Sequence, residues 1–136
     1  MNRFVLDCSV TMAWCFEDQA NDYTEKVLES LSKTTAIVPH LWILEVTNVL
    51  LMAERRKKIT PSESSRFFEL LNQLPIMIAT EKESRLDETF ISLGRTYQLS
   101  SYDSSYLHLA MGDGLPLATR DKSLMAACKK SGVKIY

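Results

Sequence analysis

Short apolar runs alternate with longer helical stretches along the whole chain, and this alternation limits the fold more than any other feature of the sequence. Such runs are typical of buried strands, and the stretches between them are long enough for crossover helices. Parallel strands joined in this way are covered by helices on both faces. We therefore expect an α/β fold, a three-layer α/β/α arrangement with a mostly parallel sheet of four to five strands. The expected strands are residues 4–6, 36–38, 76–78, 115–119 and 133–135.

Local signals mark where the intervening helices begin and end. Pro39 suits the first turn of a helix that continues to Arg56 and whose apolar side includes Leu44. The Thr-Pro-Ser-Glu sequence of residues 60–63 is a helix-start pattern, and Ser9 is expected to cap a short helix. The expected helices are residues 10–16, from 21 or 22 to 34, 39–56, 60–74, 82–97, from 99 to a glycine at 112 or 114, and from 120 to the glycine at 132.

Length and composition indicate one compact domain. With 136 residues, 46% of them hydrophobic, the chain is long enough for one core and too short for two, so we expect residues 1–136 to form a single domain. Cys8, Cys15 and Cys128 share no metal-ligand spacing and are expected to be reduced, buried thiols. The absence of a signal-peptide pattern and of an apolar run of ~20 residues predicts a cytoplasmic protein without a membrane partner.

Four acidic residues stand where a purely structural role fits poorly: Asp7, Glu45, Asp103 and Asp121. Asp7 follows the first expected strand and Asp121 follows the fourth, so both are expected at the crevice above the carboxyl ends of the strands. Glu45 interrupts an apolar helix face, and Asp103 opens a helix rich in large side chains. Each has an alternative explanation, since Asp103 and Asp121 are good helix caps and Glu45 alone could point into solvent.

A cluster of these four carboxylates predicts a site for a divalent cation. Carboxylates that lie close together repel one another and raise each other's pKa unless a cation lies between them. Oxygen ligands without a nearby histidine or cysteine favour Mg²⁺ or Mn²⁺, which suit phosphodiester hydrolysis by a metal-activated water. Ser9 and Thr119 lie beside the acids, where they either orient a water or phosphate or satisfy local backbone donors, the more ordinary role.

Four blocks of sequence, residues 4–10, 38–50, 99–107 and 115–121, each contain one of the acids. Together they resemble, in order and spacing, the motifs of the PIN-domain family, specifically the VapC-like toxin ribonucleases of prokaryotic toxin–antitoxin pairs. The resemblance covers the whole chain and implies that the four acids bind one or two Mg²⁺ or Mn²⁺ ions and that a metal-activated water cleaves RNA. It also implies a homodimer inhibited by a small cognate antitoxin. Some relatives carry a further acid after the fourth, whereas residues 122–124 are Lys-Ser-Leu here, which argues against a complete second metal site.

Several basic residues outside the cluster are candidates for contacts with the RNA backbone. Arg55 and Arg56 either contact phosphates or complement the dipole of the helix that they end. Arg120 and Lys122 flank Asp121 and are further candidates. The net charge of −1 does not by itself indicate a nucleic-acid binder, but a carboxylate cluster would hide a basic surface in the total.

The aromatic and imidazole side chains allow functional and structural interpretations. Both tryptophans are expected in the core, whereas Tyr102 and Tyr106 are left open between core packing and stacking on RNA bases. His108 is expected to be packed or hydrogen-bonded to a partner rather than to act as a general base. His40 is expected to start a helix.

Two other classes of function are compatible with parts of the pattern. One is a catalytically silent module that keeps the fold to bind a partner, and the intact acids argue against it. The other is a different metal-dependent phosphoryl-transfer enzyme or a receiver domain. A phosphotransferase usually has a second acid where Ser9 stands, and residues 76–80 offer no aspartate that a receiver would need after the third strand.

Overall fold

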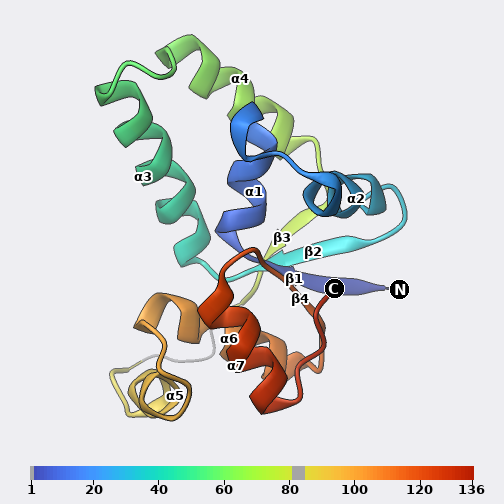
Figure 1. The fold of residues 1–136 in the computed structure, drawn as a ribbon, viewed down its shortest axis with the longest axis vertical. Coiled ribbons are helices and arrows are strands. Elements are labelled where there is room, and N and C mark those ends of the chain that lie inside the picture. Colours follow the sequence, from blue (N-terminus) through green and yellow to red (C-terminus); the bar gives the residue numbers. More distant parts are fainter. Residues whose placement is uncertain (1, 81–84) are drawn as a thin grey trace.

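A parallel sheet lies at the centre of the computed structural model, which describes residues 2–80 and 85–136 (Figure 1). Within that part of the chain its four strands have the order β3-β2-β1-β4, and every neighbouring pair is parallel. In register, Phe4 lies beside Ala36 and Val5 lies beside Leu117. The strands are β1 (Arg3–Leu6), β2 (Thr35–Val38), β3 (Ile76–Ile78) and β4 (Leu117–Ala118).

Helices cover both faces of this sheet, which confirms the expected three-layer α/β/α arrangement. Helices α1 to α4 lie on one side of the strands, and α5 to α7 lie on the other (Figure 1). None of the helices in the described residues combines the length and apolar character needed to cross a bilayer. The helices are α1 (Cys8–Cys15), the 3-10 helix η1 (Glu17–Gln19), α2 (Asp22–Ser30), α3 (Leu41–Arg55), α4 (Pro61–Asn72), α5 (Thr89–Tyr97), α6 (Ser101–Asp113) and α7 (Lys122–Ser131).

Strand β1 lies in the middle of the sheet and is buried on both faces. Phe4, Val5 and Leu6 have no exposed surface, and the Phe4 ring stacks on Tyr136 with 3.9 Å between ring centroids. A continuous apolar run is what a doubly covered parallel strand requires. The edge strand β3 is different, because Met77 is 56% exposed. The expectation of a buried third strand is therefore wrong in burial, although right in position.

The expected fifth strand is reduced to one isolated bridge between Leu117 and Ile135. Its possible partner β4 is only two residues long, so a longer ladder has nothing to pair with. Pro116 precedes β4 and has no N–H to donate, and the N–H of Leu115 donates instead to the Ala110 carbonyl at the end of α6. The strand expected over residues 115–119 is short for the same reason.

Several helix boundaries also differ from expectation. Ser9 lies inside α1 and does not cap it, and Asp7 occupies the N-cap position without a side-chain capping bond. Helix α2 ends at Ser30 rather than at residue 34. Helix α5 begins only at Thr89, since residues 85–88 are not helical, and the expected start at Lys82 lies outside the described residues.

The apolar side of α3 is rotated relative to expectation. The residues that α3 buries follow helical spacing, at Trp42, Val46, Leu50 and Ala53. Leu44 lies two positions from both Trp42 and Val46, which at 3.6 residues per turn turns it away from this stripe. It is 68% exposed, so the prediction that Leu44 faces the core is wrong.

Candidate active site

The order of the strands brings two parts of the candidate site together. From β1 the chain moves outward through β2 to β3 and then returns to β4 on the other side of β1, so the direction of winding reverses between β1 and β4. Asp7 follows β1, and Thr119 and Asp121 follow β4. The N–H of Asp7 donates to the Ala118 carbonyl at 3.0 Å, which fixes the two strand ends side by side. This is the edge at which open α/β sheets bind ligands.

Asp7 is a buried carboxylate held by two hydroxyl groups. Its side chain is only 4% exposed, and its Oδ2 accepts hydrogen bonds from Ser9 Oγ and Thr119 Oγ1, both at 2.7 Å. Burial raises the pKa of Asp7, and the two hydroxyl bonds oppose that rise without cancelling it. The carboxylate is therefore fixed in orientation while its negative charge remains only partly compensated.

Ser9 and Thr119 also satisfy backbone donors around the fourth strand. Ser9 Oγ accepts from the N–H of Arg120 at 3.0 Å, and Thr119 Oγ1 accepts from the N–H of Asp121 at 3.0 Å. Each hydroxyl thus gives its one proton to Asp7 and accepts a backbone N–H. The two residues tie the loop after β4 to the end of β1. The backbone role expected from sequence is present, and a role in orienting water or phosphate stays a prediction.

Glu45 reaches the site from the second turn of α3. It is half-buried, beside the buried Val46, and its Oε1 accepts a hydrogen bond from the hydroxyl of Tyr106 at 2.5 Å. Burial raises the pKa of Glu45, the Tyr106 bond lowers it, and the charge of Asp7 raises it further. Glu45 is therefore held toward α6 by Tyr106, within electrostatic range of Asp7, and does not simply point into solvent.

Asp103 lies in the first turn of α6, but it does not cap that helix. Ser100 is the cap, because its Oγ accepts the N–H of Asp103 at 3.1 Å. The capping interpretation of Asp103 is therefore wrong, and its carboxylate remains available. Burial, followed by the charges of Asp7, Asp121 and Glu45, raises the pKa of Asp103 to about 6. Asp103 thus lies within electrostatic range of all three other acids.

Asp121 has two roles in the structure. Its Oδ1 accepts the N–H of Leu124 at 2.9 Å, so it caps α7 as the alternative interpretation proposed. Its charge also raises the pKa of both Asp7 and Asp103. Capping and membership of the acidic cluster are therefore compatible at this position.

The electrostatics of the cluster fit a divalent cation. The charges that raise the pKa of Asp103 are those of Asp7, Asp121 and Glu45, and the charge of Asp121 also raises the pKa of Asp7. The described part of the chain contains no preformed group of three His, Cys, Asp or Glu side chains that could hold a metal ion. The acids thus lie within electrostatic range of one another without forming a closed set of metal ligands. All four can supply the oxygen ligands that Mg²⁺ and Mn²⁺ prefer.

The basic candidates divide into two groups. Arg120 and Lys122 flank Asp121 and so lie beside the acidic cluster. Arg55 and Arg56 are exposed at the far end of α3, ten or more residues beyond Glu45, which is about 15 Å along a helix. That helix extends away from the sheet (Figure 1), so the structure separates the second pair from the acids. Contact of any of the four with RNA stays a prediction.

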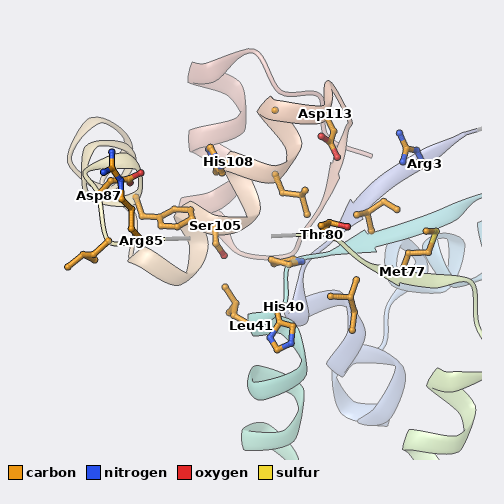
Figure 2. A pocket seen from close by; sticks show the side chains of 18 residues that line it. Arg3, His40, Leu41, Met77, Thr80, Arg85, Asp87, Ser105, His108 and Asp113 are labelled. Carbon is orange, nitrogen blue, oxygen red and sulfur yellow. The ribbon is translucent and has the colours of Figure 1, made fainter. Parts of the chain in front are cut away.

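A cavity of about 710 Å³ lies next to the cluster but contains none of the four acids. The start of α3, helices α5 and α6, and the ends of β2 and β3 surround it (Figure 2). His40 and His108 both line this cavity. The His108 ring also packs edge-on against Phe90, with 5.4 Å between ring centroids, as expected for a packed imidazole.

Tyr106 is the site residue whose role sequence reasoning left open. Its side chain is fully buried, whereas Tyr102 is 62% exposed. The sequence pattern that could have indicated a place for Tyr106 near the acids is its spacing from Asp103, since residues three apart share one face of a helix.

The two tryptophans were expected in the core. Trp42 is buried as expected, whereas Trp14 is half-buried and donates to the Thr24 carbonyl.

Comparison with known proteins places this arrangement in a family. A family model described as PIN domain matches residues 4–130. A comparison with curated protein sequences found no match. The resemblance recognised in four blocks of the sequence is thus confirmed at the level of the family.

Three solved structures have a similar fold. PAE2754 from Pyrobaculum aerophilum gives a TM-score of 0.68 at 22% identity, over 93% of this chain and 86% of that one. FitAcB from Neisseria gonorrhoeae gives 0.64 at 19%, over 98% and 96%. A domain of a functionally unknown protein from Methanocaldococcus jannaschii DSM 2661 gives 0.56 at 18%, over 100% and 90%. Because the family model covers nearly the whole chain, this protein belongs to the PIN domain family, whose members are typically nucleases that use divalent metal ions.

Proposed function

We propose that this protein is a Mg²⁺- or Mn²⁺-dependent endoribonuclease in which Asp7, Glu45, Asp103 and Asp121 bind the metal. The observation that carries the proposal is the convergence of acids from separate parts of the fold. Asp7 and Asp121 follow two strands that are hydrogen-bonded side by side, and the charges of both, with that of Glu45, raise the pKa of Asp103. A divalent ion bound there would polarise a phosphoryl oxygen and lower the pKa of an attacking water. Nothing in this chemistry requires a side-chain nucleophile.

Different neighbouring groups hold the acids of such a site in place. Asp7 is fixed by Ser9 and Thr119, so its carboxylate needs little reorganisation when a cation binds. Asp121 is held at the start of α7, where one oxygen is engaged with the backbone. Ser100 rather than Asp103 caps α6, and burial with the charges of the other acids raises the pKa of Asp103 to about 6. Pre-organised donors and acceptors of this kind lower the cost of charge rearrangement during reaction.

The proposal extends to the biological role. We infer that the protein is the toxin of a toxin–antitoxin pair, acts in the cytoplasm as a homodimer, and is inhibited by a small cognate antitoxin. The support is the resemblance of the four acidic sequence blocks to VapC-like toxins. A short reading frame immediately upstream that encodes a DNA-binding protein would support this role. Expression of the toxin without that partner is then expected to arrest growth.

Cleavage of RNA by the purified protein tests the proposed activity. Single-stranded RNA and DNA of one sequence are incubated with Mg²⁺, Mn²⁺ or EDTA. We expect RNA cleavage with either ion and none with EDTA. Asp7→Asn is expected to lower the rate by on the order of 10²-fold or more, because losing a metal ligand removes several kcal/mol of transition-state stabilisation.

The control for these variants is Asp18→Asn, which removes the same charge from an exposed position in η1. It is expected to cleave RNA as the unmodified protein does. Full activity of Asp7→Asn and Asp103→Asn in the presence of metal would contradict the assignment of the acids. A folded protein that binds RNA but never cleaves it would instead support the silent binding module.

A further inference from the structure

The hydrogen bond between Tyr106 and Glu45 joins two helices that lie on opposite sides of the sheet. Glu45 belongs to α3 and Tyr106 to α6, 61 positions later in the chain. The hydroxyl donates to Glu45 Oε1 at 2.5 Å, a length typical of strong O–H···O⁻ bonds. Asp103 lies one turn before Tyr106 on the same helix. One turn of α6 thus carries both Asp103 and the Tyr106 hydroxyl, which hydrogen-bonds to Glu45.

The Tyr106 ring is well suited to fix the position of its hydroxyl. The ring belongs to the hydrophobic core and has no exposed surface. A tyrosine has only two side-chain torsions, and burial on all sides leaves it one orientation. Glu45, in contrast, is half-exposed and has three torsions, and the charge of Asp7 repels it. Without a donor, Glu45 would turn toward solvent, where its charge is better hydrated.

Two of the other acids are also held by donors. Asp7 accepts hydrogen bonds from two hydroxyls, and Asp121 accepts one from the backbone N–H of Leu124. Groups that orient metal-binding side chains in this way typically change metal affinity by 10- to 100-fold when removed. Tyr106 supplies the same kind of support to Glu45, but from the core and across the sheet.

We propose that Tyr106 is a positioning residue that holds the Glu45 carboxylate in the orientation needed to bind the divalent ion. The inference rests on the proposed function, since it assumes that Glu45 is a metal ligand. The hydroxyl acts only through Glu45 and touches neither the ion nor the RNA. Its loss therefore weakens metal binding and leaves the chemistry of the bound state intact.

The variant Tyr106→Phe keeps the buried ring and removes only the hydroxyl. Mn²⁺ binding to the RNA-free protein is measured by isothermal titration calorimetry, and thermal unfolding of the metal-free protein is measured alongside. We expect Mn²⁺ affinity to fall by about 10-fold or more. RNA cleavage should recover when the Mn²⁺ concentration is raised by the same factor.

Tyr136→Phe is the matched control, because it removes a tyrosine hydroxyl that contacts Thr34 at the other end of the strands. It is expected to bind Mn²⁺ as the unmodified protein does. In a Glu45→Ala background, Tyr106→Phe should have no further effect on Mn²⁺ affinity, because the side chain through which it acts is gone.

Two results separate this inference from the function on which it rests. If the unmodified protein binds Mn²⁺ and cleaves RNA, and folded Tyr106→Phe binds Mn²⁺ equally well, the positioning role is overturned and the proposed function stands. A lower unfolding temperature with unchanged Mn²⁺ affinity would likewise show a merely structural tyrosine. If the unmodified protein neither binds Mn²⁺ nor cleaves RNA, both proposals fail together.

Discussion

Replacing Asp103 by asparagine is expected to stabilise the metal-free protein by an amount that grows as the pH rises from about 4 to about 7. The pKa of Asp103 is raised from 3.8 to about 6, chiefly by burial and then by Asp7, Asp121 and Glu45. When folding raises the pKa of a carboxyl group, the stability that this group contributes is greatest below its pKa in the unfolded protein. That contribution is lost as the pH rises through its pKa in the folded protein. Asparagine, which stays neutral, loses nothing over the same range.

The size of the effect follows from the shift. A rise from 3.8 to about 6 corresponds to ~3 kcal/mol if the group is fully shielded from solvent. Asp103 is only half-buried, so solvent screening reduces this to about 1.5 kcal/mol. For a domain of this size that free energy shifts the unfolding temperature by about 5 °C. The shift should be complete at pH 7.5 and close to zero at pH 4.

Thermal unfolding of both proteins in EDTA, followed by circular dichroism from pH 4 to 8, measures the difference. Asp18→Asn removes the same charge from an exposed site and should give no pH-dependent difference. Adding Mg²⁺ at pH 7.5 should reverse the order, because an ion that binds only the folded state stabilises it and the variant has lost a ligand. An Asp103→Asn protein that is less stable than the unmodified one in EDTA at pH 7.5 would refute the reasoning.

Two further variants test the framework around the site. Thr119→Val should lower the free energy of unfolding by about 2 kcal/mol, measured by urea titration. The substitution removes one hydrogen-bond donor from buried Asp7 and the acceptor of the Asp121 N–H. Unchanged stability would contradict a role for this hydrogen-bond network. Gly94→Ala should also destabilise, by about 1–2 kcal/mol, because its Cβ would lie 2.9 Å from the Leu99 carbonyl oxygen. Gly112→Ala is its control, because outside the backbone of α6 no atom of the described residues lies within 4 Å of that Cβ, and it should gain up to ~1 kcal/mol in helix propensity.

The positions of the acids relative to strands and helices could be predicted from local sequence. The apolar run before Asp7 indicates a strand that is covered on both faces. The carboxyl end of such a strand, in the middle of a parallel sheet, lies at the edge where ligands bind. The interruption of an apolar helix by Glu45 is likewise visible without a structure. Both patterns depend only on residues that are neighbours in the sequence, so they can be interpreted without knowledge of the tertiary structure.

Features that depend on distant partners could not be predicted in the same way. The exposure of Met77 follows from the place of β3 at the sheet edge, which no local pattern reveals. Whether Ser100 or Asp103 caps α6 depends on the residue at which the helix begins, and α6 begins at Ser101, which leaves Ser100 in the N-cap position. The bond from Tyr106 to Glu45 spans 61 residues and depends on how two helices meet.

The stability of the fold and the capacity to bind a cation oppose each other at this site. Burial raises the pKa of Asp7, Glu45 and Asp103, so each ionised carboxylate lowers the stability of the metal-free protein at neutral pH. Hydroxyl donors reduce that cost for Asp7 and Glu45 while holding them in place. Among the described residues no hydroxyl contributes to the pKa of Asp103, so a bound cation would be the group that offsets its charge. Metal binding and folding are therefore expected to be coupled through Asp103.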